Sequence, residues 1–141
     1  MIYIGIDPGT HTGVAIWDNK QREFVELATI PIHQALLKVK NYYNDNNKGL
    51  SNICVVFEDA RQRTWFGKDK NTNAKLQGAG SIKRDCSIWE DFCKDYQIPF
   101  LAVPPMKGGT KLSEAYFKTI SGWKGRTSNH ARDAAMLVIG R

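Results

Sequence analysis

The chain has 141 residues, a length that suits one domain with a single hydrophobic core. Its composition, 42% hydrophobic and 24% charged, is typical of a globular protein, and no apolar run approaches the roughly 20 residues that a membrane-spanning helix needs. Twenty Lys and Arg residues against 14 Asp and Glu give a formal net charge of +6. This excess favours a polyanionic partner, although many domains without such a partner are mildly basic too.

The cysteines, Cys54, Cys86 and Cys93, are odd in number and form no Cys-x-x-Cys pair. Their spacing argues against a disulfide framework and against a zinc site. No secretory signal is recognisable in the sequence. We therefore expect reduced thiols and a cytoplasmic protein, either nucleoid-associated or encoded by a phage.

Hydrophobic periodicity predicts the order of the elements along the chain. The patterns predict strands at 1–6, 13–17 and 23–30, a helix at 33–43, a strand at 53–57, a helix at 74–96, a strand at 98–103, and helices at 112–120 and 129–139. The short connections between the first three strands favour an antiparallel meander. The order predicts an α/β fold for the single domain 1–141: a mixed five-stranded sheet, three antiparallel strands and then two further strands, flanked by helices.

Polar segments predict loops at 44–52, 61–73 and 106–110. Gly78 and Gly80 indicate an interruption of the helix at 74–96. Thr110 or Lys111 is expected near the start of the next helix, and Ser128 is the N-cap candidate for the last one.

Two carboxylates come at the ends of predicted strands. Asp7 follows an apolar strand and, by alternation, lies on the opposite face from Ile4 and Ile6. The sequence Asp-Pro-Gly is equally consistent with plain turn chemistry. Glu58 ends the apolar run at 53–57, where a carboxylate is costly unless it is compensated. Its neighbour Asp59 points the other way if the strand continues.

A histidine and an aspartate share one face of the last predicted helix. His130 and Asp133 are three residues apart, in the first turn of a helix that continues into apolar residues. The helix dipole favours Asp133 at this position without any function, and His130 is also consistent with an exposed or capping histidine. Small alanines at 131, 134 and 135 would let this helix approach a sheet closely.

Together these four side chains form a candidate metal site with carboxylate oxygens and one imidazole. Mg²⁺ prefers carboxylates and substrate phosphates, and two such ions about 4 Å apart hydrolyse phosphodiesters without a covalent nucleophile. The sequence contains no phosphate-binding Gly-x-x-x-x-Gly-Lys-[Ser/Thr] motif. The metal site is therefore expected to comprise Asp7, Glu58, His130 and Asp133.

The element order and three motifs resemble the RuvC family of Holliday junction resolvases, within the RNase H-like nuclease superfamily. The segment Ile4-Gly5-Ile6-Asp7-Pro8-Gly9-Thr10 looks like the family's first catalytic strand, Val56-Phe57-Glu58 like its fourth-strand glutamate, and His130-Ala131-Arg132-Asp133-Ala134-Ala135 like its final helix. The family commonly has an acidic residue where this chain has His130. The resemblance implies a homodimer that resolves four-way DNA junctions by paired phosphodiester hydrolysis with Mg²⁺ or Mn²⁺.

Clusters of basic and aromatic residues suggest how DNA would be held. Lys and Arg would contact backbone phosphates, and an aromatic pair at 65–66 would stack on unpaired bases or, equally, cover core or dimer surface. The candidate DNA-binding residues are Arg61, Arg63, Trp65, Phe66, Lys68, Lys83, Arg84, Lys107, Lys111, Lys124 and Arg126.

Three other functions are consistent with parts of the pattern. Another RNase H-like nuclease could act on RNA–DNA hybrids or on flap and fork DNA, because nothing in the sequence reports on the 2′-hydroxyl. A non-catalytic nucleic-acid-binding module would not need all three carboxylates. An actin-like ATP-binding protein could share the segment at 5–10, but 141 residues leave no room for its two-domain clamp.

Overall fold

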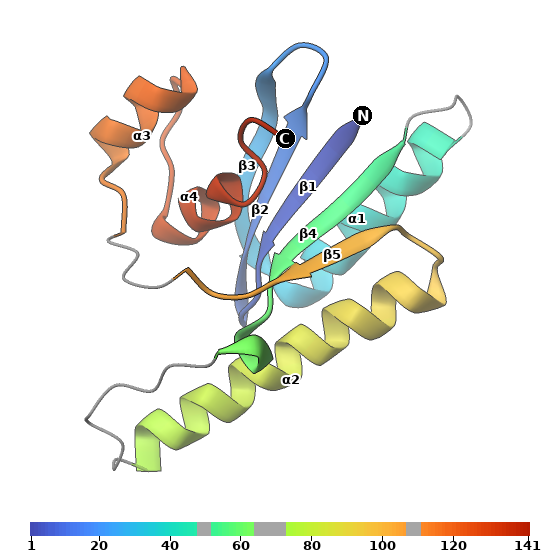
Figure 1. Cartoon of the computed structure of the whole chain (residues 1–141), viewed down its shortest axis with the longest axis vertical. Coiled ribbons are helices and arrows are strands. Elements are labelled where there is room, and N and C mark those ends of the chain that lie inside the picture. Colours follow the sequence, from blue (N-terminus) through green and yellow to red (C-terminus); the bar gives the residue numbers. More distant parts are fainter. Residues whose placement is uncertain (48–51, 64–72, 107–110) are drawn as a thin grey trace.

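The computed structural model describes residues 1–47, 52–63, 73–106 and 111–141 (Figure 1). None of the helices in these ranges is long and apolar enough to cross a membrane. In chain order the elements are β1 (Ile2–Asp7), β2 (His11–Asp18), β3 (Glu23–Pro31), α1 (Ile32–Asn47), β4 (Ile53–Glu58), the 3₁₀ helix η1 (Ala60–Gln62), α2 (Asn73–Asp95), β5 (Phe100–Val103), α3 (Glu114–Ser121) and α4 (Asn129–Met136).

The strands form one mixed sheet in the order β3-β2-β1-β4-β5. The first three strands are antiparallel neighbours, and β4 and β5 run parallel to β1. This confirms the predicted α/β fold with three antiparallel strands and two further strands. In the parallel pair, Ile6 lies opposite Phe57, so the residues that follow them, Asp7 and Glu58, end neighbouring strands at the same edge of the sheet.

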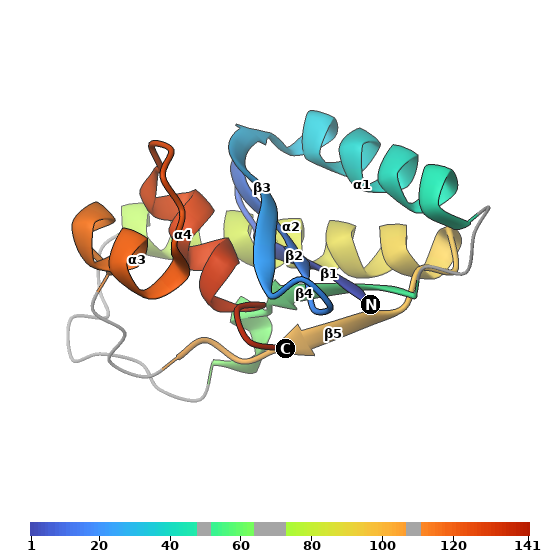
Figure 2. The same ribbon diagram turned by 90° about the horizontal axis from the view of Figure 1, so that it is seen from above.

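Helices cover both faces of the sheet, each over its own apolar core (Figures 1 and 2). On one face α1 and α2 pack on the fully buried Ile4, Ile6 and Phe57. On the other face α4 and α3 pack on Ala15, Val56 and neighbouring residues. Because side chains alternate along a strand, Asp7 and Glu58 project towards the α4 face, as the periodicity of β1 predicts.

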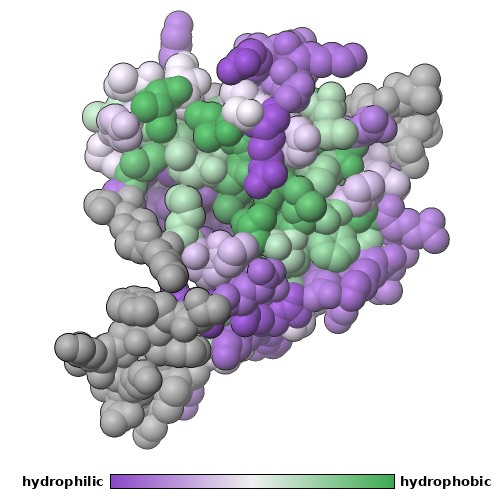
Figure 3. Space-filling view, viewed as in Figure 1, coloured by the Kyte–Doolittle hydropathy of each residue, from purple (hydrophilic) through white to green (hydrophobic). Residues whose placement is uncertain are grey.

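The α4 face is only partly covered by the described elements. Figure 3 shows an apolar area over β4 and β5, with polar side chains around it. Leu101 on the edge strand β5 is 45% exposed, and a pocket of about 440 Å³ is lined by Tyr3, Cys54 and Leu101 among others. The three cysteines are free thiols, as expected.

Several predicted boundaries differ from the structure. The helix α1 continues to Asn47, so a loop at 44–47 is wrong; the weak helix propensity of Asn is outweighed by the packing of the preceding turns. The helix α2 runs without interruption through Gly78 and Gly80. Ser113, not Thr110 or Lys111, caps α3. Residues 61 and 62 of the predicted loop at 61–73 belong to η1, and 64–72 lie outside the described residues.

The two glycines within α2 give a stability prediction. A Cβ at Gly78 or Gly80 would meet no atom within 4 Å, so alanine adds helix propensity without a clash. We expect Gly78→Ala and Gly80→Ala each to raise the free energy of unfolding by about 0.5–1 kcal/mol, measured by urea denaturation. Gly122→Ala is the opposite control, because the α3 C-cap has φ +70°, and it should be destabilising. A loss of stability in both α2 variants would contradict the prediction.

Candidate active site

Asp7 ends β1 in contact with the first turn of α4. Its Oδ2 atom lies 2.8 Å from His130 Nδ1, and its side chain is 19% exposed. Burial raises the pKa of Asp7, the hydrogen bond with His130 opposes this, and the charge of Asp133 raises it further. Because an ionised carboxylate only accepts, Nδ1 of His130 then donates.

Glu58 ends β4 beside Asp7. Its neighbour Phe57 is fully buried, and the pairing of Glu58 with Val103 continues the sheet to this point. Burial raises the pKa of Glu58, the charges of Asp7 and Asp133 raise it further, and Arg63 opposes them. Asp7, Glu58 and Asp133, which are widely separated in the sequence, are therefore close enough in the fold to act on one another electrostatically.

The backbone of α4 lies directly on β1 and β2. A Cβ at Gly13 would be 2.0 Å from the carbonyl oxygen of His130, and a Cβ at Gly5 would be 2.1 Å from that of Ala134. The helix begins at the predicted N-cap: Ser128 Oγ accepts a hydrogen bond of 3.1 Å from the backbone N–H of Ala131. Glycine on the sheet and alanine on the helix thus set the distance at which the side chains of the first turn meet β1.

The donor set suits a hard divalent cation in kind. Carboxylate oxygens are the ligands that Mg²⁺ prefers, and three neighbouring carboxylates in a partly buried site, only partly offset by His130, Arg63 and Lys111, favour a cation among them. Within the described ranges, however, no group of three or more His, Cys, Asp or Glu side chains is arranged to hold a metal ion. Coordination by Asp7, Glu58 and Asp133 would therefore require side-chain rotation.

Cations and apolar side chains surround two of these carboxylates. A pocket of about 340 Å³ is lined by Glu58 and Asp133, by the cations Arg63 and Lys111, and by an apolar wall of Pro105, Met106, Leu112, Met136 and Leu137. The charge of Lys111 also lowers the pKa of Asp7. The pocket therefore offers positive charge for a phosphate directly beside the carboxylates.

The other predicted DNA-binding residues are distributed over the surface. Lys83, Lys124 and Arg126 are exposed, and Arg84 is exposed but paired with the buried Asp85. The structure thus brings only Arg63 and Lys111 of the described candidates to the carboxylate pocket. Four candidates, Trp65, Phe66, Lys68 and Lys107, lie outside the described residues.

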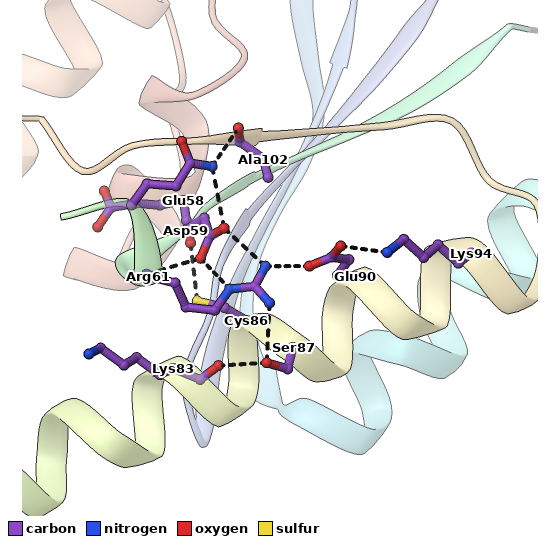
Figure 4. Close-up of polar contacts among 10 residues, drawn as sticks. Glu58, Asp59, Arg61, Lys83, Cys86, Ser87, Glu90, Lys94 and Ala102 are labelled. Atoms are coloured by element: carbon purple, nitrogen blue, oxygen red, sulfur yellow. Dashed lines mark hydrogen bonds and ion pairs between the residues drawn. The ribbon is translucent and has the colours of Figure 1, made fainter.

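Arg61 has internal partners. Its guanidinium pairs with Asp59 and Glu90 and donates to Ser87 Oγ (Figure 4). Asp59 is 4% exposed, and the hydrogen bonds and charge of Arg61 hold its pKa below the usual value despite the cost of burial. The alternation of β4 indicates that Asp59 points away from Glu58, but nothing in the sequence identifies Glu90 on α2 as the second carboxylate that pairs with Arg61.

Arg132 is a second arginine with internal partners. It is 7% exposed and donates to the carbonyl oxygens of Leu112 and Thr127 and to the Asn129 side chain. It therefore ties the segments before α3 and α4 to the start of α4.

Neither a scan against protein-family models nor a search of the curated proteins finds a match to this chain.

Proposed function

We propose that the protein is a metal-dependent, structure-selective DNA endonuclease of the RNase H-like, RuvC type that resolves Holliday junctions. The observation that carries the proposal is the meeting of Asp7, Glu58 and Asp133 at one sheet edge. These carboxylates come from β1, β4 and α4, and each of the first two has its pKa raised by the charge of Asp133. A fold that tolerates such repulsion gains most when a cation binds there.

The fold and the cations support the same proposal. The resemblance implies a mixed sheet with three antiparallel strands, two further strands and flanking helices, and the chain has such a sheet. Arg63 and Lys111 lie in the pocket with Glu58 and Asp133. There they would bind the phosphates on either side of the bond to be cut, while the remaining basic surface holds the arms of the junction.

Asp7, Glu58 and Asp133 would hold Mg²⁺ or Mn²⁺, two ions per site, with His130 as the nitrogen donor. When bound, such ions supply an activated water and stabilise the leaving oxygen. His130 has a role in the chain itself: its Nδ1 fixes the orientation of Asp7, and its side chain is 46% exposed. Nε2 is thus the ring nitrogen of His130 that would bind an ion.

The test compares substrates under one set of conditions. Labelled four-way junction, flap, duplex and RNA–DNA hybrid are incubated with the chain, with and without Mg²⁺ or Mn²⁺. We expect paired symmetric nicks in the junction, only with metal, and a homodimer by light scattering, because two simultaneous cuts need two sites. Cleavage of the hybrid or flap alone would assign the site to another RNase H-like nuclease. Tight junction binding without any cleavage would indicate a binding module.

A further inference from the structure

A polar network on the α2 side of the sheet holds the backbone next to Glu58. We infer that Arg61 is a positioning residue for Glu58: it locks the end of β4 to α2 so that Glu58 stays directed at Asp7 and Asp133. This role rests on the proposed function for its activity readout. It replaces the predicted role of Arg61 in binding DNA phosphates.

The contacts of Arg61 use all three nitrogens of its guanidinium. Nε donates to Asp59 Oδ1 at 2.7 Å and Nη2 to Asp59 Oδ2 at 2.9 Å, a bidentate pair. Nη2 also donates to Glu90 Oε2 at 2.5 Å, and Nη1 donates to Ser87 Oγ at 3.2 Å. Figure 4 shows the guanidinium between the end of β4 and α2. A phosphate could bind this fork only by displacing these partners.

The pair with Asp59 is partly removed from water. The Asp59 side chain is 5% exposed and that of Arg61 is 31% exposed. Breaking such a pair from one side leaves a buried carboxylate without its counter-charge, which is far more costly than the loss of a surface ion pair. Glu90 is further held by Lys94, so the network continues along α2 from a buried inner pair to an exposed outer one.

Glu58 is directly attached to this locked segment. The backbone N–H of Asp59 donates to Val103 O on β5 at 2.7 Å, and Cys86 Sγ on α2 lies 3.5 Å from the carbonyl oxygen of Glu58. Because consecutive strand side chains project to opposite faces, fixing Asp59 against α2 directs Glu58 to the α4 face. A rotation of the backbone that released Asp59 would turn Glu58 away from the other carboxylates.

Arg61 and Arg63 form a matched pair for the test. Both are arginines in the segment after β4, but Arg61 has internal partners and Arg63 lines the carboxylate pocket. For Arg61→Ala we expect single-turnover cleavage to fall about 10–100-fold, the usual effect of losing a partner that orients a metal ligand. Junction affinity and the slope of log K against log salt should stay at the wild-type values. Arg63→Ala should instead weaken junction binding and reduce the magnitude of that slope by about one.

Further variants separate positioning from folding. Arg61→Lys keeps the charge but loses the bidentate fork, so it should fold and still cleave more slowly than wild type. Glu90→Gln removes the charge of one of the two α2 partners of Arg61 and leaves Ser87 and Asp59 in place. It should likewise fold and cleave more slowly than wild type, which keeps the test open should Arg61→Ala fail to fold. Lys94→Ala removes an exposed partner of Glu90 and should cleave at the wild-type rate. The affinity for Mn²⁺ in the absence of DNA, measured by titration calorimetry, should be weaker in Arg61→Ala than in wild type and unchanged in Lys94→Ala.

Two results would overturn the role of Arg61. One is a folded Arg61→Ala that cleaves like wild type. The other is a slope of log K against log salt whose magnitude is smaller by about one in Arg61→Ala, as expected when a phosphate contact is lost. Failure of the proposed function has a different signature, since the wild-type chain itself would then cut only the hybrid or flap, or none of the four substrates, with either metal.

Discussion

Asp7→Asn is expected to abolish Mg²⁺-dependent cleavage of a four-way junction and to leave junction binding intact. The substitution keeps the size of the side chain but removes the negative charge that Asp7 contributes beside Glu58 and Asp133. Loss of a residue that hydrogen-bonds to a metal ligand typically lowers metal affinity or activity about 10–100-fold. Loss of the ligand itself should therefore lower the cleavage rate by more than about 100-fold. The measurement is single-turnover cleavage alongside a binding isotherm.

The same variant should not be less stable than wild type without metal. Burial and the charge of Asp133 raise the pKa of Asp7, so the ionised carboxylate is disfavoured in the fold, and the neutral amide removes this cost. Mg²⁺ should raise the melting temperature of wild type by binding only the folded chain, and should not do so for Asp7→Asn. Asp91→Asn, at an exposed position on α2, is the control. Persistent cleavage by Asp7→Asn would remove Asp7 from the site.

Gly13→Ala is expected to damage both stability and cleavage. Its Cβ would lie 2.0 Å from the backbone oxygen of His130 and 3.1 Å from Asp7 Cβ. Backbone cannot yield as a flexible side chain does, so α4 must move away from β2. We expect a loss of about 1–3 kcal/mol in the free energy of unfolding, typical of overpacking. Cleavage should fall further than the folded fraction accounts for, because His130 and Asp133 move with the helix.

Gly9→Ala is the matched control for this prediction. Gly9 lies in the turn between β1 and β2, close to Gly13 in the sequence, but its Cβ would approach nothing nearer than 3.4 Å, an ordinary contact. This variant should unfold and cleave like wild type. If Gly13→Ala matched it in urea unfolding and in cleavage, the close approach of α4 would not determine the geometry of the site.

The positions of Asp7 and Glu58 at strand ends were predictable because they depend on hydrophobic periodicity. Alternation along β1 predicts that Asp7 lies on the other face of the sheet from Ile4 and Ile6, and the structure confirms this. The end of an apolar run marks Glu58, whereas its place beside Asp7 follows from the parallel pairing of β4 with β1 in the structure. Helix boundaries were less predictable: α1 outlasts its apolar pattern, because packing of earlier turns supports residues of poor intrinsic propensity.

The roles of the arginines could not be predicted from charge. Arg61, Arg63 and Arg132 have the same side chain, yet one is paired with a buried aspartate, one lines the pocket and one is buried among carbonyl oxygens. Some of their partners, Glu90 for Arg61 and Leu112 for Arg132, are far away along the chain. Only the docking of α2 and α4 on opposite faces of the sheet decides which cation faces water.

Sequence patterns are enough to predict the order of strands and helices, the face on which each carboxylate lies and the capping of α4 by Ser128. These features are local, because they follow from the period of a strand or the first turn of a helix. The tertiary structure alone decided the distance between α4 and the sheet, through Gly5 and Gly13, and the engagement of Arg61 by α2. Such contacts join distant segments through close packing, for which a single sequence carries no periodic signal.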